Sequence, residues 1–324
     1  MDRGAFCGQS KVVIVAGKGG VGKTTVTAAL ARMAADVGFG VLVVELDDGC
    51  GLPALFGRET GFDYGGAALY LNSGSGGQVW GRVITPDEAL VEYLEDRGLR
   101  RVAKRLTATG VAEVVATAIP GIREILVLGK VKHLERSGAA DLIVVDAPAA
   151  GHAVTFLTSA AGLADAARGG PLRLQAEEVV DMLQDSARCQ VMLVSLPEET
   201  PVNELIETAF QLEDLVGVAL GPVVVNACYP VLSHLRADPM AAAEAANVDL
   251  PDYDLAARLR AAASFRVARQ DLQSVQLTRL ADVLPLPQLR LPYQFTAELG
   301  PEELGVLSEA LGGAVEAMNP EGRA

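Results

Sequence analysis

The segment that most constrains this chain lies close to its start. An apolar, β-branched run over residues 12–16 leads directly into Gly17-Lys18-Gly19-Gly20-Val21-Gly22-Lys23-Thr24-Thr25, and an alanine-rich helical pattern follows over residues 28–31. Glycines let a turn wrap closely enough for several backbone N–H groups to face one point, and the first turn of a helix adds its positive end. This strand–turn–helix order predicts a cradle for the phosphates of a nucleotide.

The residue types in this turn suit nucleotide chemistry. In such a loop Lys23 would neutralise the β and γ phosphates, Thr24 would place its hydroxyl on Mg²⁺, and Thr25 would contact the α phosphate. Lys18 is a second cation that an ordinary phosphate loop does not need. It could stabilise charge on the transferring phosphoryl group, and from its own loop it would more easily face a neighbouring subunit. The sequence therefore predicts ATP and Mg²⁺ as cofactors, a dimer with nucleotide at its interface, and a cradle backbone formed by Gly17, Gly19, Gly20, Val21 and Gly22.

Short apolar runs without polar alternation recur along the chain and are typical of strands covered on both faces. They occupy residues 11–16, 40–46, 141–146, 190–196 and 222–227. Helical patterns separate them: Thr200 and Pro201 mark the start of a helix over residues 202–216, and Thr85-Pro86-Asp87-Glu88 is a capping box. This alternation predicts an α/β fold, a P-loop NTPase with a mainly parallel central sheet flanked by helices.

We expect residues 1–324 to form a single domain with two helical additions. The stretch between the second and third motif strands is too long for one crossover, and it contains the flexible sequence Asn72-Ser73-Gly74-Ser75-Gly76-Gly77. We interpret residues 60–138, approximately, as an inserted helical subdomain. A second helical excursion is expected over about 239–282, followed by a last strand within 283–291 and a closing helix over 301–318.

Composition excludes several classes of protein. The 324 residues carry 27 Lys and Arg against 41 Asp and Glu, a net charge of −14 that disfavours binding to nucleic acid. The longest uncharged run, residues 215–235, contains Pro222 and Pro230 and fits a strand plus loop better than an integral membrane segment. We expect no secretion signal at the N-terminus, because an acidic residue at position 2 and Lys11 precede any apolar stretch of signal-peptide length. The four cysteines form no pair at short spacing, so we expect buried thiols in a reducing cytoplasm: Cys7, Cys50, Cys189 and Cys228.

Further candidate residues follow the carboxyl ends of the predicted strands. Asp146 ends the third strand, where an acidic residue would help to hold the Mg²⁺ of a bound nucleotide. The turn after it contains Gly151, whose backbone could sense the γ-phosphate and rearrange on hydrolysis. Asp47 and Asp48 follow the second strand at the same sheet edge. One of these two carboxylates is expected to position the attacking water.

Together these motifs resemble the deviant Walker-A ATPases, and within them the family of the arsenite-pump ATPase ArsA and the ATPase that guides tail-anchored proteins. The loop of residues 17–25 is similar to that family's loop throughout, and the resemblance implies that Lys18 acts across a dimer interface. It also implies that Asp47 prepares the hydrolytic water and that residues 146–152 form the second switch, with Ala150 where a threonine is usual. The resemblance further assigns adenine recognition to Asn226 and closure over the base to Leu286 and Pro287.

The resemblance leaves the partner and the pathway open. The chain carries one phosphate loop and looks like the bacterial single-half branch, so a homodimer and a heterodimer with a sister ATPase are both possible. The leading hypothesis is a dimeric Mg-ATPase whose helical subdomains open and close around a client or sister subunit. The alternatives are a regulatory subunit with little hydrolysis and a ParA/MinD-like positioning switch. The basic run over residues 97–105 is either a solvated, ion-paired face or a site for an acidic partner.

Overall fold

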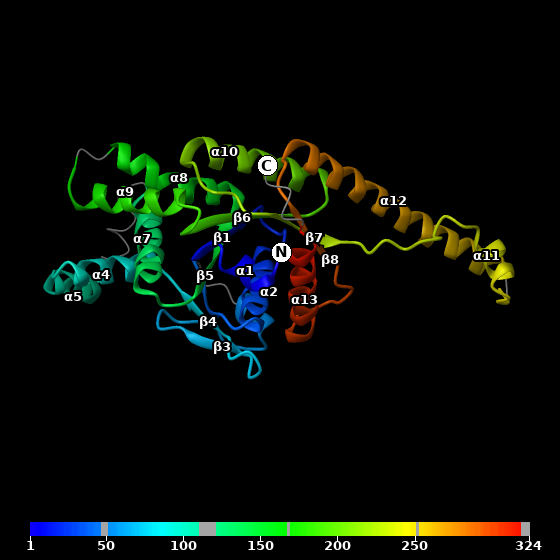
Figure 1. Cartoon of the computed structure of the whole chain (residues 1–324), viewed down its shortest axis with the longest axis horizontal. Coiled ribbons are helices and arrows are strands. Elements are labelled where there is room, and N and C mark those ends of the chain that lie inside the picture. The colour runs from blue at the N-terminus through cyan, green and yellow to red at the C-terminus, as the bar shows by residue number, and fades with distance from the viewer. Residues whose placement is uncertain (47–50, 110–120, 167–168, 251–252, 319–324) are drawn as a thin grey trace.

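A computed structural model describes residues 1–46, 51–109, 121–166, 169–250 and 253–318. At its centre is an eight-stranded sheet with the order β3-β4-β2-β5-β1-β6-β7-β8 (Figure 1). All neighbouring strands are parallel except β3 and β4, which pair antiparallel at one edge. The strands are β1 (Val12–Gly17), β2 (Gly40–Glu45), β3 (Ala67–Leu71), β4 (Gln78–Val83), β5 (Leu142–Ala149), β6 (Cys189–Ser195), β7 (Val223–Cys228) and β8 (Gln288–Pro292). The predicted α/β fold with a mainly parallel sheet is confirmed.

Helices cover both faces of the sheet because its inner strands are apolar on both sides. Along β1, Val12 and Ile14 pack into one core and Val13 and Val15 into the other, the two-residue alternation that a strand imposes. One face is covered by α1 (Arg3–Cys7), α2 (Lys23–Asp36), α3 (Gly51–Leu55) and α13 (Pro301–Ala317). The other face is covered mainly by α7 (Ile122–Ser137), α8 (Ala150–Ala166), α9 (Pro171–Gln184) and α10 (Glu199–Val216).

The expected helical subdomain over residues 60–138 is wrong in its first part, which contains strands β3 and β4. Val79 and Val83 of β4 are buried while their neighbours alternate toward the surface, so this short segment adds a strand beside β2. The glycine- and serine-rich sequence after Asn72 is a hairpin turn, in which the Asn72 side chain accepts hydrogen bonds from the backbone of Gly74 and Ser75. Among the described residues, the helical part comprises α4 (Pro86–Asp96), α5 (Arg100–Thr109) and α7.

Two of the predicted helix starts differ in detail from the structure. Thr85 is the N-cap of α4, but its hydroxyl donates to the Glu88 carboxylate at 2.7 Å and caps no backbone N–H. Helix α10 begins at Glu199, with Glu198 as its N-cap, so Thr200 lies inside the first turn. Both helices still begin within a few residues of the predicted positions, because proline near N1 fits a helix start.

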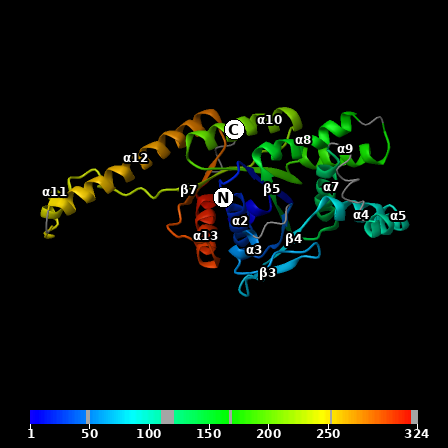
Figure 2. The ribbon, with the colours of Figure 1, turned by 180° about the vertical axis from the view of Figure 1, so that it is seen from behind.

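The second excursion forms an arm that leaves the body of the protein. Helix α12 (Tyr253–Val283) extends away from the sheet, and α11 (Pro239–Ala245) packs at its far end (Figures 1 and 2). An aromatic cluster of Tyr229, Tyr293 and Phe295 marks the base of the arm, and the guanidinium of Arg266 lies 4.1 Å from the Tyr229 ring centroid. No helix among the described residues is both apolar and long enough to cross a membrane.

Three of the four cysteines lie within the described residues and have free thiols. Cys7 and Cys189 are buried and Cys228 is partly buried, as expected for small apolar residues. Burial raises the thiol pKa to about 12 at Cys7 and Cys189, and to about 11 at Cys228. These thiols are therefore protonated at neutral pH. Cys50 lies outside the described residues.

Candidate functional site

The glycine-rich loop lies between β1 and α2 and makes a close approach to the neighbouring strand. A Cβ atom on Gly17 would lie 2.4 Å from the carbonyl oxygen of Val194 in β6, so only glycine fits there. Gly20 and Gly22 have φ angles of +85° and +89°, in the left-handed region that favours glycine. Gly22 is also the N-cap of α2, so the loop ends at the positive end of that helix. The loop therefore has the local geometry of an anion cradle.

Lys23 is the first residue of α2 and its side chain turns back over the loop. Its Nζ donates to the carbonyl oxygen of Lys18 at 3.3 Å. Burial lowers the pKa of Lys23, and the nearby negative charge of Asp146 partly opposes this effect. A phosphate bound in the cradle would supply a second negative charge and stabilise the protonated amine.

The structure brings Thr24 and Asp146 together, as predicted for the two groups near Mg²⁺. Asp146 is opposite Val15 in the β1–β5 register, which places it beside the loop, and its Oδ2 accepts the Thr24 hydroxyl at 2.6 Å. Burial raises the pKa of Asp146, although the Thr24 hydroxyl and Lys23 oppose the shift. Its other oxygen, Oδ1, is buried and has no hydrogen-bond partner among the described residues. A hydroxyl and a carboxylate with an unsatisfied oxygen fit the oxygen ligands that Mg²⁺ prefers.

Lys18 has a partner that the sequence analysis did not foresee. Its Nζ lies 2.6 Å from Oε1 of Glu204 in α10, and each side chain is 38% exposed. The lysine expected to serve a neighbouring protomer therefore pairs with its own chain here. Its action across a dimer interface stays a prediction.

Asn226 contacts the loop rather than lying apart from it. Its Nδ2 donates to the carbonyl oxygen of Val21 at 3.0 Å, and its Oδ1 accepts from the backbone N–H of Ala227 at 2.9 Å. A Cβ atom on Gly22 would lie 2.3 Å from Asn226 Nδ2. This residue thus supports the phosphate loop from the end of β7, a role that the sequence analysis missed. Adenine recognition by Asn226 stays a prediction.

The expected base-closing segment lies next to β7. Leu286 is partly buried against the core, and the carbonyl oxygen of Pro287 accepts from Val223 N–H at 2.8 Å. These contacts fix the segment beside the strand that carries Asn226, and its contact with a base stays a prediction. Gly151 lies in the first turn of α8, and its proposed sensing of phosphate also stays a prediction. Asp47 lies outside the described residues.

The remaining loop residues differ in exposure. Gly19 and Gly20 are exposed, Thr25 is partly buried, and Val21 is 2% exposed. The open glycines leave backbone accessible to a ligand, while Val21 anchors the loop in the core beneath α2. This division fits a rigid loop with an accessible inner surface.

Comparisons with known proteins agree with this geometry. The model of the anion-transporting ATPase family matches residues 10–166. The chain is 32% identical over 307 residues to ATPase BagA of Mycobacterium tuberculosis, covering 86% of each protein. It is 29% identical over 209 residues to the arsenical pump-driving ATPase of Escherichia coli, covering 62% of this chain and 32% of that protein. It is 30% identical over 147 residues to ATPase get3 of Schizosaccharomyces japonicus, covering 45% of this chain and 43% of that protein.

The family match spans the strand, loop and helix that form the cradle, together with β5 and Asp146. The match to the mycobacterial ATPase extends over most of the chain, whereas the chain covers only about a third of the E. coli pump ATPase. On these grounds the chain belongs to the ArsA/Get3 family of ATP-hydrolysing enzymes, as a single-half bacterial member.

Proposed function

We propose that this chain binds MgATP in the loop of residues 17–25 and hydrolyses it as one half of a dimer in the cytoplasm. In this proposal, nucleotide state changes the packing of the helical elements around a client or a sister subunit. The observation that carries it is the contact between Thr24 and Asp146, with one buried Asp146 oxygen unsatisfied and Lys23 close by. An acidic group left in this condition inside a protein is costly unless a cation completes it.

Each residue of the site has a defined task in this proposal. The backbone N–H groups of the loop and the N-terminus of α2 bind the phosphates, and Lys23 neutralises charge on the β and γ phosphates. Thr24 and Asp146 hold Mg²⁺, which when bound would neutralise charge that develops on the phosphate oxygens. Asp47 orients the attacking water, and Lys18 stabilises the transferring phosphoryl group of the opposite protomer.

The names of the relatives leave the client open. The Escherichia coli relative is named as driving an arsenical pump, but the described thiols of this chain are separate from one another and protonated at neutral pH. Metalloids bind thiolates, so these thiols are poor ligands. We therefore propose a protein client or a related sister ATPase as the partner, in a homodimer or a heterodimer.

Steady-state ATPase measurements on Lys18→Ala and Lys23→Ala test this proposal, with Lys11→Ala as a control at an exposed lysine on the same segment. We expect both loop variants to lose turnover by at least about a hundredfold, since each removes a charge that stabilises the transition state. Fluorescent nucleotide binding should weaken in Lys23→Ala and persist in Lys18→Ala. Native mass measurement with and without ATP reports the dimer. Wild-type protein that binds nucleotide without turnover, alone or with a sister ATPase, would instead be a regulatory subunit.

A further inference from the structure

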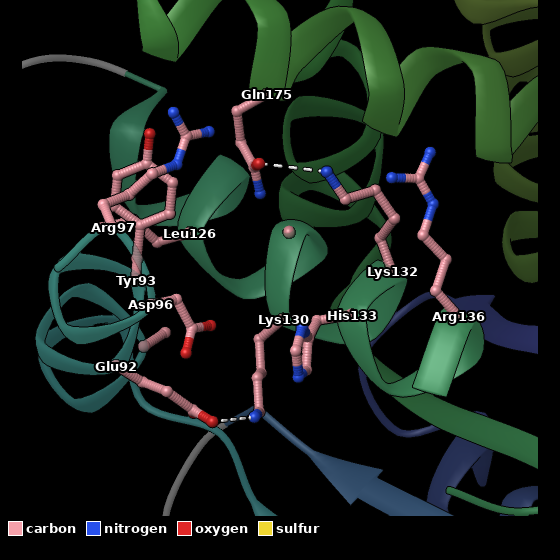
Figure 3. Close-up of a pocket in the computed structure, with 12 residues that line it drawn as sticks. Glu92, Tyr93, Asp96, Arg97, Leu126, Lys130, Lys132, His133, Arg136 and Gln175 are labelled. Carbon is pink, nitrogen blue, oxygen red and sulfur yellow. Dashed lines mark hydrogen bonds and ion pairs between the residues drawn. The ribbon is translucent and has the colours of Figure 1, made fainter. Parts of the chain in front are cut away.

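A polar pocket of about 200 Å³ opens between α4, α7 and α9, on the helical side of the molecule. None of its lining residues belongs to the phosphate loop, to Asp146 or to Asn226, so it is separate from the nucleotide site. Its walls come from three helices that are far apart in sequence. Figure 3 shows the charged side chains of α4 and α7 around the pocket, with Glu92 facing Lys130 and the Gln175 amide of α9 facing Lys132.

Two lysines of α7 are buried in the pocket walls. The side chains of Lys130 and Lys132 are 8% and 6% exposed, which is unusual for an ammonium group. Lys130 pairs with Glu92 of α4, and Lys132 donates to the Gln175 amide oxygen of α9 at 3.0 Å (Figure 3). Lys132 also pairs with Glu178 of α9. Each lysine therefore joins α7 to a different neighbouring helix.

Gly129, in the middle of α7, leaves room for the Gln175 side chain beside the pocket. A Cβ atom on Gly129 would lie 2.1 Å from Nε2 of Gln175, so any larger residue would displace that amide from the pocket wall. Glycine inside a helix costs about 1 kcal/mol relative to alanine. At this position the missing side chain lets the Gln175 amide of α9 lie against α7 beside the pocket.

The pocket carries more positive than negative charge. Four cationic side chains line it, and with Glu178 only three carboxylates are present to balance them. Arg97 has no carboxylate partner among the described residues, and its guanidinium carbon lies 5.0 Å from the Tyr93 ring centroid. Arg136 shares Glu178 with Lys132, at 3.3 Å, and its side chain is 51% exposed. This surplus occurs in a chain whose net charge is −14.

The ion pairs with Glu92 and Glu178 involve Lys130, Lys132 and Arg136, but they leave Arg97 without a carboxylate partner among the described residues. Burial lowers the pKa of Lys132; the Glu178 carboxylate opposes this shift, and repulsion from Arg136 and Arg97 adds to it. Three cations thus lie close enough to repel one another, and an anion between them would relieve this repulsion. Arginine also matches carboxylate and phosphate groups with two parallel N–H donors.

We propose that this pocket binds a small organic anion, carrying a carboxylate or a phosphate group, between Arg97, Lys132 and Arg136. The volume suits a metabolite of a few carbons and is too small for a nucleotide. Lys130 and Gln175 lie on the floor and wall, where they can donate to further oxygen atoms of such a ligand. The proposal does not depend on ATP hydrolysis, because the pocket and the phosphate loop share no residue.

Calorimetric titration with succinate and with glycerol 3-phosphate tests the site and distinguishes its two possible anionic groups. The full chain is saturated with MgADP beforehand, so that a phosphate cannot enter the nucleotide loop, and glycerol is the uncharged comparison. We expect one equivalent of at least one anion to bind. Arg97→Gln and Arg136→Gln should each weaken binding by about tenfold, the value of one charge-assisted hydrogen bond.

Arg173→Gln is the matched control, since Arg173 lies on α9 with a side chain 44% exposed and pairs with Glu177 outside the pocket. This variant should bind as wild type does. Both pocket arginines are exposed enough to be replaced without unfolding the protein, which a thermal melt verifies. The proposal is overturned if neither anion shows saturable binding up to about 10 mM; a Kd of about 10 mM corresponds to a binding free energy of only about 3 kcal/mol. It is also overturned if binding persists unchanged in both pocket variants.

Discussion

Replacing Glu204 by glutamine would release Lys18 from its intramolecular ion pair while keeping the size of the side chain. The two groups meet at 2.6 Å, but each is 38% exposed, so water screens their attraction. An ion pair of this kind contributes about 0.5–1 kcal/mol. If Lys18 must leave Glu204 to reach a phosphate, breaking the ion pair adds this energy to the activation free energy of hydrolysis. Its removal should raise kcat by up to about fivefold, because 1.4 kcal/mol corresponds to a factor of ten.

Steady-state ATPase activity at saturating MgATP measures this effect. Glu207→Gln is the matched control, since Glu207 lies one turn further along α10, is exposed, and also loses one negative charge on substitution. The free energies of unfolding of the two variants should lie within about 1 kcal/mol of the wild-type value, because exposed ion pairs contribute little to stability. Higher salt should bring the wild-type rate closer to that of Glu204→Gln, as screening weakens the pair.

The opposite outcome would refute this reasoning. If Glu204→Gln loses turnover to the same extent as Lys18→Ala, the ion pair belongs to the active arrangement and orients Lys18 for catalysis. If Glu204 restrains Lys18, the substitution raises kcat; if Glu204 positions Lys18 for catalysis, the substitution lowers kcat. The comparison therefore needs no absolute rate, only the direction of change relative to Glu207→Gln.

Two further substitutions test the phosphate site. Asp146→Asn should stabilise the metal-free protein in EDTA by about 1 kcal/mol at neutral pH, because it removes a buried charge with an unsatisfied oxygen, while abolishing Mg²⁺-dependent turnover. Burial raises the pKa of Asp146 in the folded state above its unfolded value, so the ionised carboxylate destabilises the fold at pH values above the folded-state pKa. The difference in melting temperature between Asp146→Asn and wild type should therefore disappear as the pH falls through the folded-state pKa. Asn226→Ala should weaken ATP and GTP binding equally, by about fivefold, if the amide mainly supports the loop through Val21; a loss confined to ATP in nucleotide titrations would instead show base recognition.

The parts of the site that sequence reasoning could predict are those fixed by local geometry. The loop of residues 17–25 needs its glycines for positive φ angles and for the approach to β6, and these needs appear directly in the residue types. Asp146 was predictable because parallel strands bring their carboxyl ends to one edge of the sheet. Apolar runs likewise predicted the central strands, since a strand buried on both faces has no polar alternation.

The parts that were not predictable depend on contacts between distant segments. Lys18 and Glu204 are separated by 186 positions, and no local pattern links a loop lysine to one of several glutamates on a helix. The contact of Asn226 with Val21 could not be predicted for the same reason, since it also joins segments far apart in the sequence. Strands β3 and β4 were missed for a different reason: β4 contains Gly81, against which the Phe62 ring packs, and glycine lowers strand propensity.

The position of Glu204 connects the phosphate loop to the helical layer. Helix α10 packs against both α8 and α9, and α9 carries Gln175 and Glu178, the partners of Lys132 in the pocket. Packed helices cannot move independently, because interiors are filled at crystal-like density. Any displacement of α10 that accompanies release of Lys18 must therefore be accommodated by its neighbours. Since α7 and α9 pack against each other and both line the pocket, an anion that fixes their spacing would favour one position of α10 over another, which makes the two sites candidates for energetic coupling.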